Sequence, residues 1–165
     1  MHDVATAFSA AIGPGFRHRD HGTMNPVPSA RPTPPELLQQ ARTIAVVGFS
    51  TDPTKAAHRA PMVLVDRGWN VIPVHPTATE VAGLTAYKTL ADIPVPVDLV
   101  DVFRPPSEAP GIAEQAAAIG AKTLWLQKGI TSPEARDIAT RAGMTFVEDT
   151  CAGATATTLN LFPNP

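Results

Sequence analysis

Cysteine is almost absent from this chain of 165 residues, in which Cys151 is the one thiol. A single cysteine excludes an internal disulfide framework and a cysteine-built zinc site, and it is typical of a reducing compartment. Long apolar runs are also missing. The longest, such as residues 43–49, have the length of a strand, whereas a membrane-spanning helix needs about 20 apolar residues. We therefore expect a cytoplasmic protein that does not cross a membrane.

Neither sign of charge is in excess, because 13 Lys and Arg residues stand against 15 Asp and Glu residues and the net charge is -2. Such a chain lacks the broad field that holds nucleic acid or an anionic membrane. We expect neither as a partner, and an anionic ligand has to be bound by a local pocket. A homodimer or an unidentified protein partner is compatible with the sequence.

The hydrophobic content of 44% is enough for one sizeable core. Residues 1–32 contain scattered His, Gly and Pro without the apolar segment of a secretory signal, so we expect a flexible N-terminal extension. Residues 33–165 would form one domain with a short C-terminal tail. Thr33 and Glu36 have the spacing of a capping box, which predicts a helix that ends near Arg42.

Five apolar, β-branched segments predict strands covered on both faces: 43–48, 70–74, 98–102, 123–126 and 145–147. Helices are predicted over 60–67, 107–119 and 132–143, whereas 84–96 has too many Pro, Thr and Asp residues for a long helix. This alternation predicts an α/β, Rossmann-like, doubly wound parallel sheet of about five strands, in the order 3-2-1-4-5. Ligands of that fold bind beyond the carboxyl ends of the first and fourth strands.

The loop after the first strand has the features of a phosphate-binding turn. Glycine lets the backbone approach a ligand, hydroxyls donate to it, and the N-terminus of a helix favours negative charge. The candidates are Gly48, Ser50, Thr51, Lys55, His58 and Arg59. The G-x-G-x-x-G fingerprint is missing, because Ser50 and Pro53 stand where further glycines would be. An ordinary strand-to-helix turn with solvated cations is the alternative.

The second strand ends at Val74-His75-Pro76. No Asp or Glu follows it to hold the ribose of a nicotinamide cofactor, which argues against NAD. His75 is either a buried turn residue or a catalytic group. The third strand ends at Phe103 and Arg104. This pair can pack on adenine and bind phosphate, or it can serve the core and the sheet edge instead.

The fourth strand is followed by Gln127, Lys128 and Gly129, which offer donors and a close approach of the backbone. Trp125 alternates with two leucines inside that strand, so we expect it in the core.

These segments, IAVVGFST, VIPVHP, VDLVDVFRPP, WLQKGI and VEDTCAG, resemble the small bacterial CoA-binding proteins related to the CoA-binding domain of succinyl-CoA synthetase. The likeness runs from about Leu37 to Cys151 and matches five strand ends in order. It implies a nucleotide-binding protein whose cofactor is coenzyme A or an acyl-CoA.

The resemblance also implies a role for each group of site residues. It implies phosphate contacts from Gly48, Ser50 and Thr51 with Lys55, His58 and Arg59 as nearby cations, a nucleotide framed by Val74 and Pro76, an adenine bordered by Phe103 and Arg104, and pantetheine and pyrophosphate near Gln127, Lys128 and Gly129. The chain departs from the family at His75-Pro76-Thr77, where Asn-Pro-Lys is frequent, and at Asp149-Thr150-Cys151, where Asp-Arg-Cys is frequent. A basic residue is missing at each place.

Succinyl-CoA synthetase needs a separate ligase domain, and the residues after Cys151 are too few to form one. No Ser-His-Asp order, carboxylate pair or metal-spaced histidine cluster is evident, so we assign no catalytic residue and no metal. We expect a stand-alone CoA-binding module without a complete catalytic site. An NAD(P)-binding oxidoreductase and an accessory subunit of an acyl-CoA ligase or transferase are the alternatives. Cys151 is either a candidate for a disulfide with the CoA thiol or an inert thiol.

Overall fold

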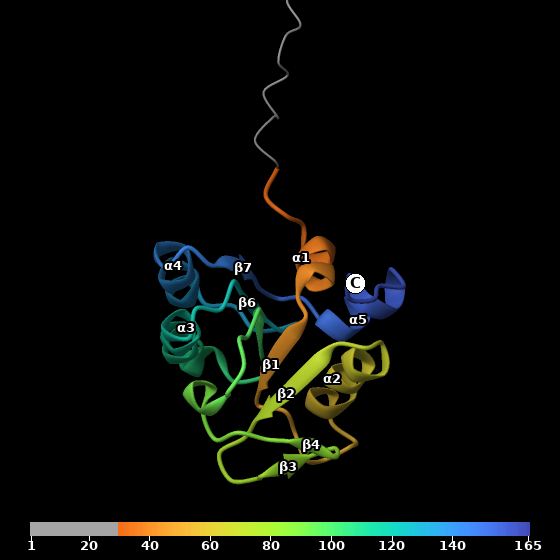
Figure 1. The fold of residues 1–165 in the computed structure, drawn as a ribbon. Helices are drawn as coiled ribbons and strands as arrows, with labels where there is room; N and C mark the ends of the chain where they lie inside the picture. The colour runs from red at the N-terminus through yellow and green to blue at the C-terminus, as the bar shows by residue number, and fades with distance from the viewer. Residues whose placement is uncertain (1–29) are drawn as a thin grey trace, which may run out of the picture. The chain divides into compact units, whose positions relative to one another are not determined.

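A computed structural model of the chain describes residues 30–165 (Figure 1). The predicted N-terminal extension, residues 1–32, lies almost entirely outside the described residues. The α-helices are α1 (Pro34–Gln40), α2 (Ala56–Asp66), α3 (Ala109–Ala118), α4 (Pro133–Arg141) and α5 (Ala152–Thr158), and short 3-10 turns form η1 (Leu90–Asp92) and η2 (Pro106–Glu108). The strands are β1 (Thr43–Val47), β2 (Asn70–Val74), β3 (Glu80–Val81), β4 (Leu84–Thr85), β5 (Leu99–Val102), β6 (Thr123–Leu126) and β7 (Thr145–Val147).

The main sheet has five parallel strands in the order β2-β1-β5-β6-β7, with helices on both faces. The predicted α/β, doubly wound, Rossmann-like fold is confirmed, and all five predicted segments are strands of this sheet. The detailed order needs a correction. The third predicted strand, β5, pairs directly with β1, with Val46 opposite Asp101, whereas the order 3-2-1-4-5 would place it beyond β2.

The connection between β2 and β5 accounts for this order. It contains the antiparallel hairpin β3–β4 and the turn η1, with no long helix, as the composition of residues 84–96 suggested. η1 packs against α3, on the sheet face opposite to α2. A right-handed crossover on that face carries the chain past β1 to its free side. The direction of winding therefore reverses between β1 and β5.

Alternating side chains of the strands build two cores. In β1, Ile44 and Val46 point to the side of α1, α2 and α5, whereas Ala45 points to the side of α3 and α4. Trp125 is fully buried on the α2 side, and its indole N–H donates to the Thr150 carbonyl at 2.7 Å. The predicted core position of Trp125 is confirmed.

α2 begins earlier than predicted, at Ala56, with Pro61 inside the helix. Proline has no N–H to bond the carbonyl four residues back. That carbonyl, of Ala57, accepts instead from the N–H of Ser50 at 3.0 Å. The missing helical bond is thus replaced by one to the loop after β1, so the proline does not have to stand in the first turn.

Two other helices also differ from the sequence prediction. The chain after Cys151 forms α5 where a tail was expected, and Gly153 lets it approach α2 so closely that an added Cβ would lie 2.7 Å from the Ala60 carbonyl oxygen. The predicted helix 107–119 is divided into η2 and α3. α4 begins as predicted, because Ser132 Oγ accepts from the Ala135 N–H at 3.1 Å. Among the described residues, no helix is long and apolar enough to span a membrane.

Candidate functional site

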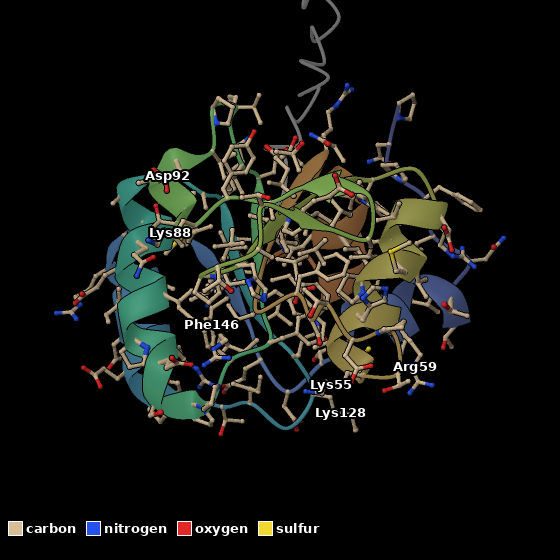
Figure 2. The ribbon with its side chains drawn as sticks, turned by 90° about the horizontal axis from the view of Figure 1, so that it is seen from below. Lys55, Arg59, Lys88, Asp92, Lys128 and Phe146 are labelled. Atoms are coloured by element: carbon tan, nitrogen blue, oxygen red, sulfur yellow. The ribbon has the colours of Figure 1, made fainter. Side chains whose placement is uncertain are left out.

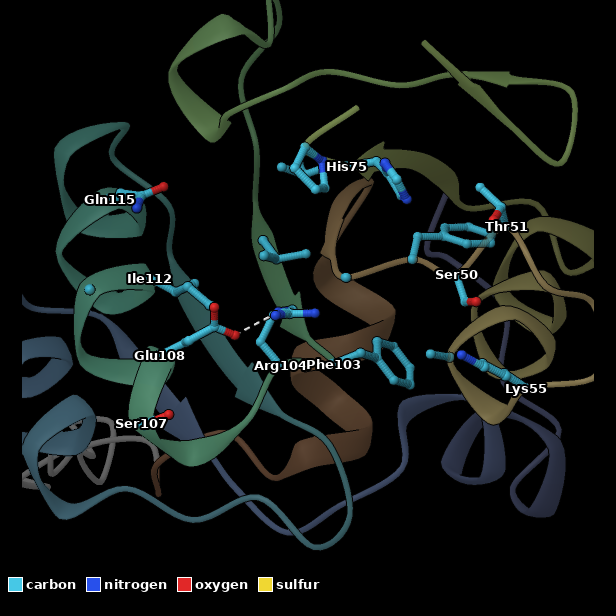
Figure 3. A pocket seen from close by; sticks show the side chains of 17 residues that line it. Ser50, Thr51, Lys55, His75, Phe103, Arg104, Ser107, Glu108, Ile112 and Gln115 are labelled. Carbon is cyan, nitrogen blue, oxygen red and sulfur yellow. Dashed lines mark hydrogen bonds and ion pairs between the residues drawn. The ribbon is translucent and has the colours of Figure 1, made fainter. Parts of the chain in front are cut away.

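A cavity of about 860 Å³ opens where the winding of the sheet reverses, beyond the carboxyl ends of β1, β2 and β5. Figure 2 looks onto this edge of the molecule, and Figure 3 shows the cavity itself. The loop after β1 and the start of α2 form one wall, and η2 with the first turns of α3 forms the opposite wall. This is the place where doubly wound sheets bind their ligands.

Gly48 forms the floor of the cavity. Its φ is +88°, and a Cβ there would lie 2.8 Å from Arg104 Cδ and 3.0 Å from the Phe103 carbonyl oxygen. Its N–H donates to the Val74 carbonyl at 3.2 Å, and the Phe103 N–H donates to the Val47 carbonyl at 2.9 Å. The three strand ends are thus joined around a residue that has to be glycine.

Hydrogen bonds within the loop hold it in one conformation. Ser50 Oγ accepts from the Asp52 N–H at 3.1 Å, and Asp52 Oδ1 accepts from the N–H and the hydroxyl of Thr54 at 2.9 and 2.7 Å. These bonds from Thr54 lower the pKa of the Asp52 carboxyl. Ser50, Thr51 and Lys55 all line the cavity, together with Gly48. The predicted phosphate loop therefore lies against the cavity, with its hydroxyls and one cation available there.

The other two predicted cations of this loop do not line the cavity. His58 turns toward the protein, where its Nδ1 donates to the Ser50 carbonyl oxygen at 2.7 Å and its ring meets Phe49 edge-on at 5.4 Å between centroids. Arg59 is exposed on α2. His58 therefore stabilises the loop through its hydrogen bond, whereas a phosphate contact from Arg59 stays a prediction.

The N-terminus of α2 points to the cavity without a side-chain cap. Lys55 is the N-cap residue, no side chain of the described residues bonds the first turn, and that turn contains no acidic residue. By contrast, α4 is capped by Ser132. Unsatisfied N–H groups at the start of an 11-residue helix attract anions, and here a lysine stands beside them.

The end of β2 contributes Val74, His75 and Pro76 to the cavity rim. His75 Nδ1 accepts from the N–H groups of Thr77 and Ala78 at 3.2 and 2.8 Å. A ring nitrogen that accepts carries no proton, so the proton of the neutral ring is on Nε2. His75 is thus a partly buried residue that caps its own turn and also lines the cavity. A catalytic role for it stays a prediction.

The end of β5 brings Phe103 and Arg104 to the centre of the site, as predicted. Arg104 Nε donates to Glu108 Oε2 at 2.6 Å, and this bond raises the pKa of the guanidinium. Both side chains line the cavity, and they remain 46% and 45% exposed.

The loop after β6 does not line the cavity, because β5 lies between β6 and β1. Gln127 is buried, and its Nε2 donates to Asp101 Oδ1 at 2.5 Å, so its amide is engaged inside the protein. The Gly129 N–H donates to Asp149 Oδ1 at 2.7 Å, while Lys128 is exposed. Of these three predicted contacts, only Lys128 has a free side chain directed to solvent at this edge (Figure 2).

Cys151 is the N-cap of α5, where its Sγ accepts from the Ala154 N–H at 3.4 Å. It is partly buried and does not line the cavity. Contact with a ligand thiol stays a prediction.

Sequence reasoning missed the wall that α3 provides. Ser107, Glu108, Gly111, Ile112 and Gln115 line it. An Ala-rich helix gives no chemical signal, although Ser107 and Glu108 lie only a few residues after the end of β5. Among residues 30–165, no group of three or more His, Cys, Asp or Glu side chains is arranged to hold a metal ion.

The sequence matches one family model and is similar to several known proteins. Residues 42–157 match the family model described as a CoA binding domain. The Bacillus subtilis protein YneT is 37% identical over 116 residues, which cover 70% of this chain and 86% of YneT. The alpha subunit of the ADP-forming acetate–CoA ligase II of Pyrococcus furiosus is 30% identical over 131 residues, 73% of this chain and 29% of that subunit.

Solved structures show the same fold. A hypothetical protein from Pyrococcus horikoshii superimposes with a TM-score of 0.74 at 32% identity, over 79% of this chain and 94% of that one. A protein from Thermus thermophilus gives 0.71 at 38% identity, over 74% and 93% of the two chains.

Proposed function

The chain belongs to the family of CoA-binding domains, and from this premise we propose that it binds coenzyme A or an acyl-CoA in the cavity between the loop after β1 and α3. The observation that carries the proposal is the uncapped N-terminus of α2, which faces the cavity beside Lys55. CoA has a diphosphate that such a site can bind through backbone N–H groups and a cation.

The remaining walls suit the rest of the nucleotide. Val74, Pro76, Phe103 and Ile112 present apolar and aromatic surface, which can pack against adenine. Arg104 adds a second cation on the side opposite to Lys55. A nucleotide can therefore lie across Gly48 with cations at both walls.

No complete catalytic set is proposed for this cavity. Its titratable side chains are Lys55, His75, Arg104 and Glu108. His75 is engaged with its own turn and Glu108 with Arg104. The chain would then act as a stand-alone module that senses, buffers or delivers the cofactor.

Calorimetric titration of the full chain tests the proposal. We expect CoA and acetyl-CoA to bind with a dissociation constant below 1 mM, which corresponds to about 4 kcal/mol or more. If neither binds at millimolar concentration while circular dichroism shows folded protein, the proposal is wrong. NADPH serves as the control, and tighter binding of NADPH than of CoA would favour the oxidoreductase alternative. That alternative is weakened by the imidazole at the end of β2, where a carboxylate would hold the ribose hydroxyls.

A role as accessory subunit is the second candidate, because the chain resembles 29% of the length of the acetate–CoA ligase alpha subunit. In that case the ligase function would lie in another chain. Acyl-CoA formation by the purified protein alone, with acetate, ATP and CoA, would contradict both candidates.

A further inference from the structure

Glu108 is the one carboxylate among the residues that line the cavity, whose other charged and polar groups are cations and hydrogen-bond donors. It contacts Arg104 through one bond, from Nε to Oε2 at 2.6 Å. An arginine has further N–H donors on its two Nη atoms, in a fixed planar fork. The bond at Nε therefore leaves the terminal donors available to a ligand, and no residue among 30–165 accepts from them.

Figure 3 shows the direction of those donors. Glu108 lies on the α3 side of Arg104, and the rest of the guanidinium extends from Nε toward the middle of the cavity, between α3 and the loop that bears Ser50 and Lys55. The stem of Arg104 also packs on the loop, because its Cδ lies over Gly48, close enough to leave no room for a Cβ. The side chain thus has contacts at its stem and at Nε.

We propose that Glu108 is a positioning residue, which aims the Nη groups of Arg104 at a phosphate bound between Arg104 and the start of α2. The inference rests on the proposed function, and it assigns to Glu108 a role that acts through Arg104. Arginine has many rotamers in solution, so an arginine that is already ordered loses less conformational entropy on binding.

The two substitutions of Glu108 have different expected effects. Glu108→Ala removes the acceptor, so Arg104 has to be ordered by the ligand, and immobilising one long side chain costs about 2- to 10-fold in affinity. Glu108→Gln keeps an acceptor for Nε and removes a negative charge near the phosphate. We expect E108Q to bind CoA as tightly as the wild type or more tightly. A role limited to the N-terminus of α3 would make both variants alike.

The experiment is calorimetric titration with CoA of the wild type, E108A, E108Q, R104A and the double variant R104A/E108A. Glu114→Ala, an exposed glutamate on α3 outside the cavity lining, is the matched control. We expect E108A to weaken binding when Arg104 is present, and to leave binding unchanged or strengthen it in the R104A background, where only the loss of a negative charge remains. Equal affinities of E108A and wild type, or equal losses in E108A and E108Q, would overturn the inference alone. Failure of the wild type to bind CoA would overturn the proposed function and this inference with it.

Discussion

The substitution Asp101→Asn tests how the buried carboxyl of Asp101 affects the stability of the fold at different pH values. Its side chain is 1% exposed in the middle of β5, and among the described residues its Oδ2 has no hydrogen-bond partner. Burial raises the pKa of this carboxyl to about 7, although bonds from Gln127 and the Val102 N–H oppose the shift. Asparagine has the same shape and remains neutral at every pH.

The sign of the effect follows from the two pKa values. In the unfolded chain the carboxyl has its ordinary pKa of 3.8, so between pH 4 and 7 the folded state holds a proton that the unfolded state has released. Wild-type stability therefore falls as pH rises through this window and levels off above it. The difference between 3.8 and about 7 corresponds to roughly 4 kcal/mol. We expect Asp101→Asn to gain up to this amount between pH 4 and pH 8.

Urea and thermal unfolding at pH 4.5, 6, 7 and 8 measure the difference. For a domain of this size, 1 kcal/mol changes the melting temperature by about 3 °C, so D101N should melt about 10 °C above the wild type at pH 8 and near it at pH 4.5. Asp137→Asn, at an exposed position of α4, is the control and should show no such trend. A stability difference that is the same at all four pH values would refute the argument.

Three further substitutions test the cavity and the packing of α5. Gly48→Ala should weaken CoA binding about 5-fold or more, because the new Cβ would meet Arg104 and a contact of this kind costs about 1–3 kcal/mol. Gly83→Ala, at φ +77° with open space around it, controls for the backbone alone. Lys55→Gln should lower CoA affinity about 3- to 10-fold and reduce its dependence on salt, since a charge-assisted bond is lost, and an unchanged salt dependence in titrations would contradict this. Gly153→Ala should lower the melting temperature, because its Cβ would lie 2.7 Å from an α2 carbonyl oxygen. This clash should outweigh the better helix propensity of alanine. A rise in melting temperature would show that α5 can move away from α2.

Local patterns were sufficient to predict the strands. The β-branched runs that contain Ile44 and Val100 are buried on both faces, and this is what an unbroken apolar segment indicates. Strand order was harder, because it depends on which face the link from β2 to β5 crosses. The irregular composition of residues 84–96 marked this link as different, but only the packing of η1 against α3 shows the consequence.

The order of the strands also explains which predicted site residues line the cavity and which do not. The ends of β1, β2 and β5 were correctly brought to one cavity, since parallel strands end at one edge. Gln127 was expected there because β6 was placed beside β1. Its actual partner, Asp101, is 26 residues away and becomes a neighbour only when β5 and β6 pair. A lone acid in the apolar segment LVDV was the available signal of such a buried partner.

The bond from the Ser50 N–H to the Ala57 carbonyl has a consequence for the motions of the site. Because Pro61 cannot supply the helical donor, the loop cannot detach without leaving a carbonyl of α2 unpaired. The loop and the first turn of α2 should therefore open together as one cooperative unit, and the amide hydrogen of Ser50 should exchange with solvent only in that joint opening. A phosphate-bearing ligand would then bind a loop whose conformation depends on Pro61, because this proline leaves the Ala57 carbonyl available to Ser50.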